Sequence, residues 1–154
     1  MAFVSIQENF YLIGLFAASL ILAVYRKRGL VYLVAVALFV GLNDFIGGQI
    51  LKGLFERPRP CLILTDVIQH MPCTHSYSFP SNHASNIFTA ATLTSLCFKN
   101  SVFFAFFLAI LVAYSRVYLG VHYPSDVMGG AVCGMLIGAL GYLIYLRGLK
   151  QFSS

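Results

Sequence analysis

Three short polar clusters interrupt an otherwise apolar sequence, and their side chains are of the kinds that phosphoryl chemistry uses. They comprise Lys52, Arg57 and Arg59 in the first cluster, Ser81, Asn82 and His83 in the second, and Arg116, His122 and Asp126 in the third. Cations and a hydroxyl can hold a phosphate dianion, and an imidazole beside a carboxylate can attack its phosphorus. Ionisable groups close to a bilayer are costly, so the clusters indicate a functional site.

The composition places this site in a membrane protein. Of the 154 residues, 59% are hydrophobic and 10% are charged, whereas a soluble domain carries about 25% charged residues. Most of the chain must therefore lie in the lipid bilayer, and residues 1–154 are expected to form a single integral-membrane domain. The net charge is +5, but the sequence contains no arginine-rich run with interleaved aromatics. We therefore expect no nucleic-acid partner.

Five apolar segments predict the fold. They are Phe10–Tyr25, Leu30–Leu51, His83–Phe98, Ser101–Tyr114 and Val127–Leu146. A helix that crosses a bilayer needs about 20 residues, so the first, third and fourth segments are short. The expected class is all-α: a polytopic membrane helix bundle with about five transmembrane helices. Glycines at positions 130, 134 and 138 predict a close helix-packing face on the fifth segment.

The cations between these segments predict the orientation. Basic residues occur at Arg26–Arg28, at Lys99, and at Arg147 and Lys150. With five crossings, all of them fall on one face, which the positive-inside rule makes cytoplasmic. The N-terminus and the three polar clusters then lie together on the opposite, non-cytoplasmic face.

The loop at residues 57–79 connects the second and third segments. Pro58 and Pro60 are expected to end the second helix, because proline lacks an N–H and disfavours helix in the residue before it. The apolar pattern of Leu62–Ile68 predicts one short interfacial helix before the third segment. Cys61 and Cys73 share this loop and could pair in an oxidising compartment, although the sequence leaves this open. No His or Cys spacing predicts a metal site.

Each candidate residue also has a purely structural interpretation. Lys52 and Arg59 could be ordinary interfacial residues with their charged ends in water, and spacing alone does not choose between Arg57 and Arg59. Ser81 suits a helix N-cap, but the N-terminus of a helix also binds phosphate. His83, in the first turn, could donate a proton to a leaving oxygen or simply be solvated.

The third cluster is the most specific. Pro124 can start the fifth segment and leave His122 just outside it. Asp126 could then accept from one imidazole nitrogen and leave the other free to attack. Alternatively, Asp126 could lie near a helix N-terminus only because of the helix dipole.

The pattern Lys-x6-Arg-Pro, Pro-Ser-x-His, Ser-Arg-x5-His-x3-Asp resembles the signature of the type 2 phosphatidic acid phosphatase superfamily. It spans residues 52–126. The resemblance selects Arg59 over Arg57 and implies His122 as the nucleophile, Asp126 as its orienting carboxylate and His83 as the general acid. It implies that the phosphate is bound by the remaining signature groups: Lys52, Arg59, Ser81, Arg116 and the backbone near Asn82. It implies neither a metal nor another cofactor.

Two features depart from the family pattern. Asn82 stands where relatives usually have glycine, although asparagine tolerates the left-handed region and its amide could donate to the phosphate. Five expected spans compare with six in many relatives. Arg57, His70 and His75 could recognise a second anionic group or be solvated loop residues.

The resemblance implies a lipid phosphatase of a bacterial inner membrane, acting on a phospholipid or glycolipid phosphate at the periplasmic face. The compact size is similar to that of bacterial lipid A 1-phosphatases. Undecaprenyl diphosphate and phosphatidylglycerophosphate are alternative substrates, and a lipid phosphotransferase could use the same histidine. A scaffold without activity is disfavoured by the intact His, His and Asp set. The hydropathy excludes the soluble vanadium haloperoxidases, which share the signature.

Overall fold

The computed structural model describes residues 8–64 and 72–151 and is helical throughout these ranges, apart from connecting turns and loops. The expected all-α class is confirmed. The elements are α2 (Glu8–Phe45), the π-helix η1 (Ile46–Leu51), α3 (Lys52–Phe55), α4 (Pro60–Ile63), α5 (Asn82–Cys97), the 3-10 turn η2 (Lys99–Ser101), α6 (Val102–Tyr118) and α7 (Pro124–Gln151).

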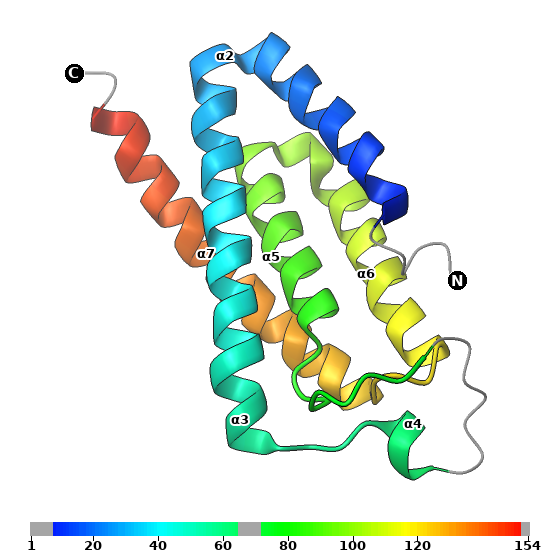
Figure 1. The fold of residues 1–154 in the computed structure, drawn as a ribbon. Coiled ribbons are helices and arrows are strands. Elements are labelled where there is room, and N and C mark those ends of the chain that lie inside the picture. The colour runs from blue at the N-terminus through cyan, green and yellow to red at the C-terminus, as the bar shows by residue number, and fades with distance from the viewer. Residues whose placement is uncertain (1–7, 65–71, 152–154) are drawn as a thin grey trace.

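Helix α2 consists of two arms that meet at Arg26. This residue has φ 49° and ψ −122°, far from helical values, and Figure 1 shows the chain reversing direction there. The break falls where the sequence predicts the end of the first apolar segment. The second arm continues through η1 and α3 to Phe55, four residues beyond the expected end at Leu51. Glu56, with φ 45°, ends it in the left-handed conformation before Pro58.

Three helical stretches of the described chain are long and apolar enough to cross a bilayer. They are Gly14–Phe55, Lys99–Tyr118 and Pro124–Gly148. Because Gly14–Phe55 contains the reversal at Arg26, this arrangement is that of a multi-pass membrane protein. Helix α5 has 16 residues, or about 24 Å at 1.5 Å per residue, and is not among these stretches. The expectation of five crossings therefore stays a prediction.

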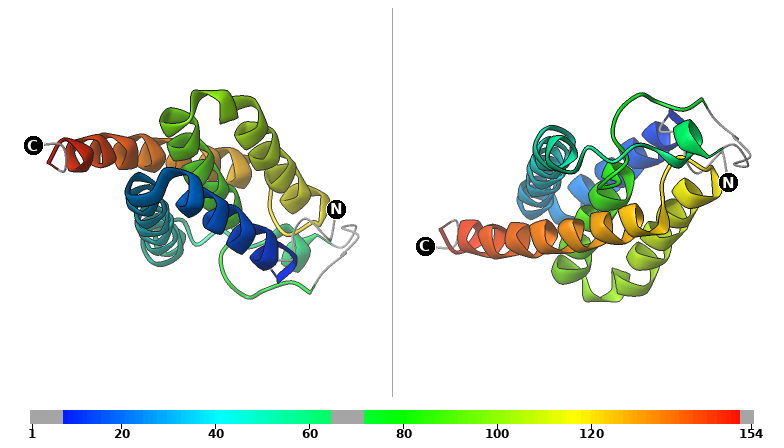
Figure 2. Two further views of the ribbon diagram at one scale, coloured as in Figure 1. Left: turned by 90° about the horizontal axis from the view of Figure 1, so that it is seen from above. Right: turned by 90° about the horizontal axis from the view of Figure 1, so that it is seen from below.

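Helix α5 is the centre of the bundle. It packs against α7, α6 and the second arm of α2, which surround it in Figures 1 and 2. Its buried residues include polar ones: Ser85, Thr89, Thr92 and Ser95. The neighbouring helices shield these hydroxyls from lipid, where an unsatisfied polar group would be costly.

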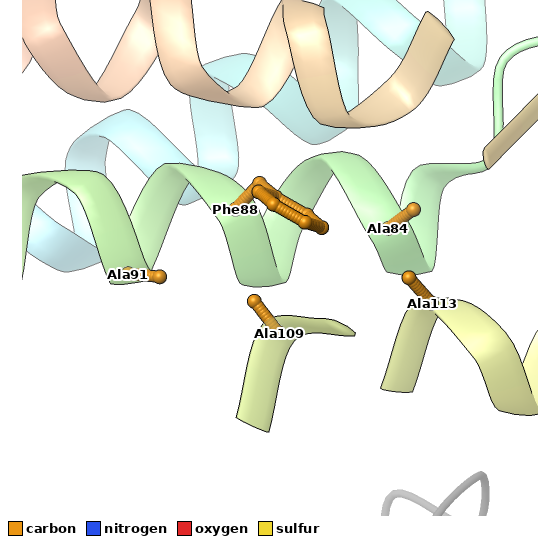
Figure 3. Close-up of a cluster of buried hydrophobic side chains, with 5 residues drawn as sticks. All are labelled: Ala84, Phe88, Ala91, Ala109 and Ala113. Atoms are coloured by element: carbon orange, nitrogen blue, oxygen red, sulfur yellow. The ribbon is translucent and has the colours of Figure 1, made fainter. Parts of the chain in front are cut away.

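Small residues bring α5 close to its neighbours. Ala84, Phe88 and Ala91 of α5 meet Ala109 and Ala113 of α6 in a buried cluster (Figure 3). On α7, a Cβ added at Gly130 would lie 2.6 Å from the Ser81 carbonyl oxygen, and one at Gly138 would lie 2.7 Å from that of Thr89. The glycine pattern therefore forms the close packing face predicted for this segment.

The loop after α3 contains a short helix, as predicted, but its bounds differ. The sequence predicts Leu62–Ile68, whereas the helical turn α4 covers Pro60–Ile63 and Leu64 is extended. Residues 65–71 lie outside the described chain. Pro60 at the first position of α4 explains the earlier start, because its fixed φ suits the first turn. Cys61 and Cys73 form a disulfide, which settles the pairing that the sequence left open.

Candidate active site

The ends of four helical elements meet on one side of the bundle, which we call the site end. It is formed by α3, the N-terminus of α5, the C-terminus of α6 and the N-terminus of α7, with the loop at 56–59 beside them (Figure 1). The predicted residues are all located there: Lys52, Arg59, Ser81, Asn82, His83, Arg116, His122 and Asp126. His83 interacts electrostatically with Arg116, His122, Arg59 and Lys52. The tertiary fold therefore brings residues up to 74 positions apart into one cluster.

Arg59 is buried and held in a fixed position by the backbone. Its Nε donates to the Ser76 carbonyl oxygen at 2.8 Å, and one terminal nitrogen donates to Ser76 Oγ at 2.9 Å. The other donates to the Val121 carbonyl oxygen at 3.0 Å and lies 3.2 Å from His122 Nε2. A cation that binds a phosphate oxygen must lie beside the attacking nitrogen, and Arg59 meets this condition.

The His122 ring lies between Arg59 and Asp126. Its Nδ1 is 3.5 Å from Asp126 Oδ2, which is too long for a well-formed hydrogen bond but leaves the carboxylate facing this nitrogen. Oδ2 itself accepts from the Tyr123 N–H at 2.9 Å. Pro124 starts α7, so His122 lies outside the helix and Asp126 lies in its first turn, as the sequence predicts. This geometry favours the tautomer with the proton on Nδ1 and a lone pair on Nε2.

The surroundings of His122 favour its neutral form. Burial is the largest cause that lowers its pKa below the usual 6.5, and the positive charges of Arg59 and Arg116 act in the same direction. Asp126 opposes them, but the net pKa is lowered. A neutral imidazole keeps its lone pair, so at neutral pH the ring is suited to nucleophilic attack.

Ser81 and Arg116 present buried polar atoms that other described residues do not satisfy. Ser81 has the extended backbone of an N-cap, but its hydroxyl makes no cap hydrogen bond. Ser81 Oγ and Arg116 Nε are both buried without a hydrogen-bond partner. Because such groups are costly to bury, both are better explained as donors to an anionic ligand than as parts of the protein's own hydrogen bonding.

His83 lies in the first turn of α5 and is half-buried. Arg116, Arg59 and Lys52 surround it with positive charge. Burial is the largest influence that disfavours a proton on the ring, and these charges add to it until a phosphate dianion is present to balance them. The arrangement therefore couples a protonated His83 to bound phosphate, which suits a general acid for the leaving group.

The Asn82 side chain points toward α2 and η1. Its amide donates to Asp44 Oδ1 at 3.0 Å, and a Cβ added at Gly47 would lie 2.9 Å from Asn82 Oδ1. The amide thus binds α2, whereas the sequence suggested that it could donate to the phosphate. Asn82 is also the first residue of α5 and is not in the left-handed region. Its backbone at the helix N-terminus remains suited to an anion.

Three contributors are missed or set aside by the sequence interpretation. Ser76 holds Arg59, and Asp44 holds Asn82, but neither belongs to a recognisable motif. Arg57, which the family spacing excludes, pairs with Asp126. The Arg-Pro-Arg-Pro run was a signal for Arg57, because two arginines separated by one residue end up in the same loop. Of the two other candidates for a second anion site, His75 is exposed, and His70 lies outside the described residues.

Metal ligands are not grouped in the part of the chain that the structure describes. Within residues 8–64 and 72–151, no three His, Cys, Asp or Glu side chains are placed to hold a metal ion. The positive charge at this site comes from Lys52, Arg57, Arg59 and Arg116, of which Arg57 is paired with Asp126.

Comparison with known proteins identifies the family of the chain. The sequence matches the profile of the PAP2 superfamily over residues 28–149. This range includes all eight predicted site residues and the helices that carry them. The chain therefore belongs to the PAP2 superfamily, which confirms the resemblance drawn from its motifs.

The individual relatives are lipid phosphatases with different named substrates. The chain is 32% identical over 127 residues to the lipid A 4'-phosphatase of Porphyromonas gingivalis, covering 78% of this chain and 53% of that protein. It is 32% identical over 124 residues to an undecaprenyl-diphosphatase of Sulfolobus acidocaldarius, covering 80% and 58%. The chain thus spans a little over half the length of these relatives. The crystal structure of Aquifex aeolicus LpxE matches with a TM-score of 0.66 and 32% identity, covering 91% of this chain and 79% of LpxE.

Proposed function

We propose that this protein is a metal-independent membrane lipid phosphatase that works through a phosphohistidine intermediate. The observation that carries the proposal is the position of His122. Its Nε2 lies 3.2 Å from the guanidinium of Arg59, while its Nδ1 faces Asp126 at 3.5 Å. One nitrogen therefore faces the phosphate-binding cation and the other faces a carboxylate, as nucleophilic catalysis by histidine requires.

The proposed reaction has two displacements at phosphorus. In the first, the Nε2 lone pair forms a P–N bond while the bond from phosphorus to the lipid oxygen breaks. That oxygen keeps the electron pair and takes a proton from His83. In the second, water attacks phosphorus, the P–N bond breaks, and His83 recovers a proton from the water. Arg59, Arg116, Lys52 and Ser81 stabilise the charge on the phosphoryl oxygens throughout.

We place this site at the outer, periplasmic face of a bacterial inner membrane. Exposed cations occur at the other end of the bundle, in Arg26–Arg28, Lys99 and Arg147, and such residues favour the cytoplasm. The disulfide between Cys61 and Cys73 lies at the site end and fits an oxidising compartment.

The substrate that we favour is the 1-phosphate of lipid A. The relative in Porphyromonas gingivalis is named for lipid A, which supports this class of glycolipid, although that name refers to the 4'-position. Undecaprenyl diphosphate is a second candidate, because the Sulfolobus relative is named for it. Phosphatidylglycerophosphate is a third member of the same chemical class, a phosphate on a lipid anchor.

Phosphate release by the purified protein tests the proposal. The assay contains EDTA and compares lipid A, undecaprenyl diphosphate, phosphatidylglycerophosphate and phosphatidate, with His122→Ala as the control. Release from one lipid, lost in the variant, is the expected result and names the substrate. Equal release by His122→Ala would overturn the phosphohistidine mechanism. A phosphorylated acceptor lipid in place of free phosphate would replace hydrolysis by transfer.

A further inference from the structure

Arg57 contacts three residues at or just before the start of α7. Its terminal nitrogen donates to Asp126 Oδ1 at 2.8 Å and to Ser125 Oγ at 2.7 Å. The guanidinium carbon also lies 4.0 Å from the centre of the Tyr123 ring, in a cation–π arrangement. These contacts give the arginine a defined position beside the carboxylate that faces His122.

The Asp126 carboxylate needs such a partner. Its side chain has no exposed surface, and a buried carboxylate is costly unless its oxygens are paired. Oδ2 accepts from the Tyr123 N–H and faces His122 Nδ1. Arg57 provides a charged partner for the other oxygen, Oδ1. With both oxygens bound, the carboxylate cannot rotate away from the imidazole.

Arg57 is itself fixed by the loop that carries Arg59. Its carbonyl oxygen accepts from the Ser78 N–H at 2.7 Å, and Glu56 before it takes the left-handed conformation that ends α3. Pro58 then separates the two arginines. The loop thus places Arg59 at Nε2 of His122 and Arg57 at the carboxylate that faces Nδ1.

We propose that Arg57 is a positioning residue, which acts through Asp126 to hold the nucleophilic imidazole of His122 in its reactive orientation. The inference rests on the proposed function and deepens it. It also assigns Arg57 a role other than binding a second anionic group of the substrate. The Arg57 side chain is 39% exposed, and a single terminal nitrogen serves both the carboxylate and Ser125.

Kinetics separate these two roles. Arg57→Ala is expected to lower kcat on the order of 10- to 100-fold, the usual cost of removing an outer-shell partner, and to leave KM within about twofold. Arg57→Lys should recover part of kcat, because it keeps the charge but not the planar fork. Arg147→Ala, a cation removed at the other end of the bundle, should leave both constants unchanged. A rise in KM with kcat intact would overturn the proposal in favour of substrate binding.

A double-mutant cycle tests whether Arg57 acts through Asp126. Residues that act as a unit are strongly non-additive. Arg57→Ala is therefore expected to lower kcat less than about threefold when it is made in an Asp126→Asn background. An undiminished loss in that background would contradict the proposed route.

A third measurement does not depend on activity. The groups that face His122 are Asp126 from α7, Arg59 from the loop, Arg116 from α6 and His83 from α5. Without Arg57, the Asp126 charge is no longer shared and stabilises the imidazolium more strongly. Titration of ¹⁵N-histidine-labelled protein by NMR should therefore give a higher His122 pKa in Arg57→Ala than in the wild type, with recovery in Arg57→Lys.

The two proposals fail differently. If the wild type releases no phosphate from any lipid, the proposed function is contradicted. The NMR titration would still show whether Arg57 acts on His122 through Asp126. A His122 pKa that is unchanged in Arg57→Ala would remove the positioning role. Phosphate release by the wild type would then still support the proposed function.

Discussion

The basic side chains at the two ends of the helix bundle differ in their exposure to solvent. At the site end, Arg59 and Arg116 are buried. At the opposite end, which we define by Arg26–Arg28, Lys99 and Arg147, the basic side chains are exposed. The sequence shows only that cations occur at both ends, because exposure depends on how the helices pack.

This difference separates two uses of the same residue types. An exposed cation beside a membrane contributes to orientation and is screened by water and salt. A buried cation is poorly solvated, and it interacts strongly with whatever anion lies beside it. The contrast predicts that equivalent substitutions have large effects at the site end and small effects at the opposite end.

The largest difference is expected for arginine removal. Arg59→Ala should lower the rate of phosphate release by about 10²- to 10³-fold, as for other preorganised donors to a developing charge. Arg28→Ala, at the opposite end, should change this rate less than about twofold, since exposed side chains away from the site have small effects. Equal losses in the two variants, measured under identical detergent conditions, would remove the functional distinction between the ends.

The next largest effect is expected when the disulfide at the site end is removed. Changing both Cys61 and Cys73 to serine should lower the free energy of unfolding by about 3 kcal/mol, the value expected for closing a loop of this length. Activity should fall as well, because Ser76, which holds Arg59, lies three residues after Cys73. The matched control is Cys97→Ser, a free cysteine near the opposite end of α5. Thermal unfolding with and without reductant measures the stability of both variants, and phosphate release measures their activity.

Helix packing on α7 gives a smaller difference. Gly130→Ala would place a Cβ 2.6 Å from the Ser81 carbonyl oxygen, which should cost about 1–3 kcal/mol of stability through overpacking. Gly148→Ala has no heavy atom within 4 Å of its added Cβ and should be neutral or stabilise the helix by up to about 1 kcal/mol. Similar melting temperatures for the two variants would contradict the close α5–α7 contact.

The smallest predicted effect concerns pH. An unperturbed histidine of pKa 6.5 would be about one quarter neutral at pH 6.0. Because burial lowers the pKa of His122, the enzyme should keep clearly more than that fraction of its pH 7.5 rate. The same lowered pKa affects the free energy of unfolding. The contribution of His122 is constant above pH 6.5. It decreases as the pH falls from 6.5 through the lowered pKa, because over this range only the unfolded chain binds the proton. A rate profile with its acid limb at or above pH 6.5 would show that His122 is not shielded.

Much of the architecture follows from local sequence. The break at Arg26, the start of α7 at Pro124 and the close face around Gly134 were all predictable, because they depend on apolar runs, proline and glycine. Fixed motif spacing selected the eight candidate site residues, and the structure places them at one end of the bundle. The helix after Leu51 was predicted less well. The end of the second arm depends on Glu56 adopting the left-handed conformation, which no residue type near it requires.

The sequence by itself determined the class of the protein, its membrane character and the chemistry available at its polar clusters. These depend on residue types and on spacings within single helices or turns. Only the tertiary structure decided that Asn82 binds Asp44, that Cys61 meets Cys73, and that Arg57 reaches Asp126. These contacts join segments that are up to 69 positions apart. Their geometry is set by how α5 packs among its neighbours, and this packing cannot be predicted from the local sequence.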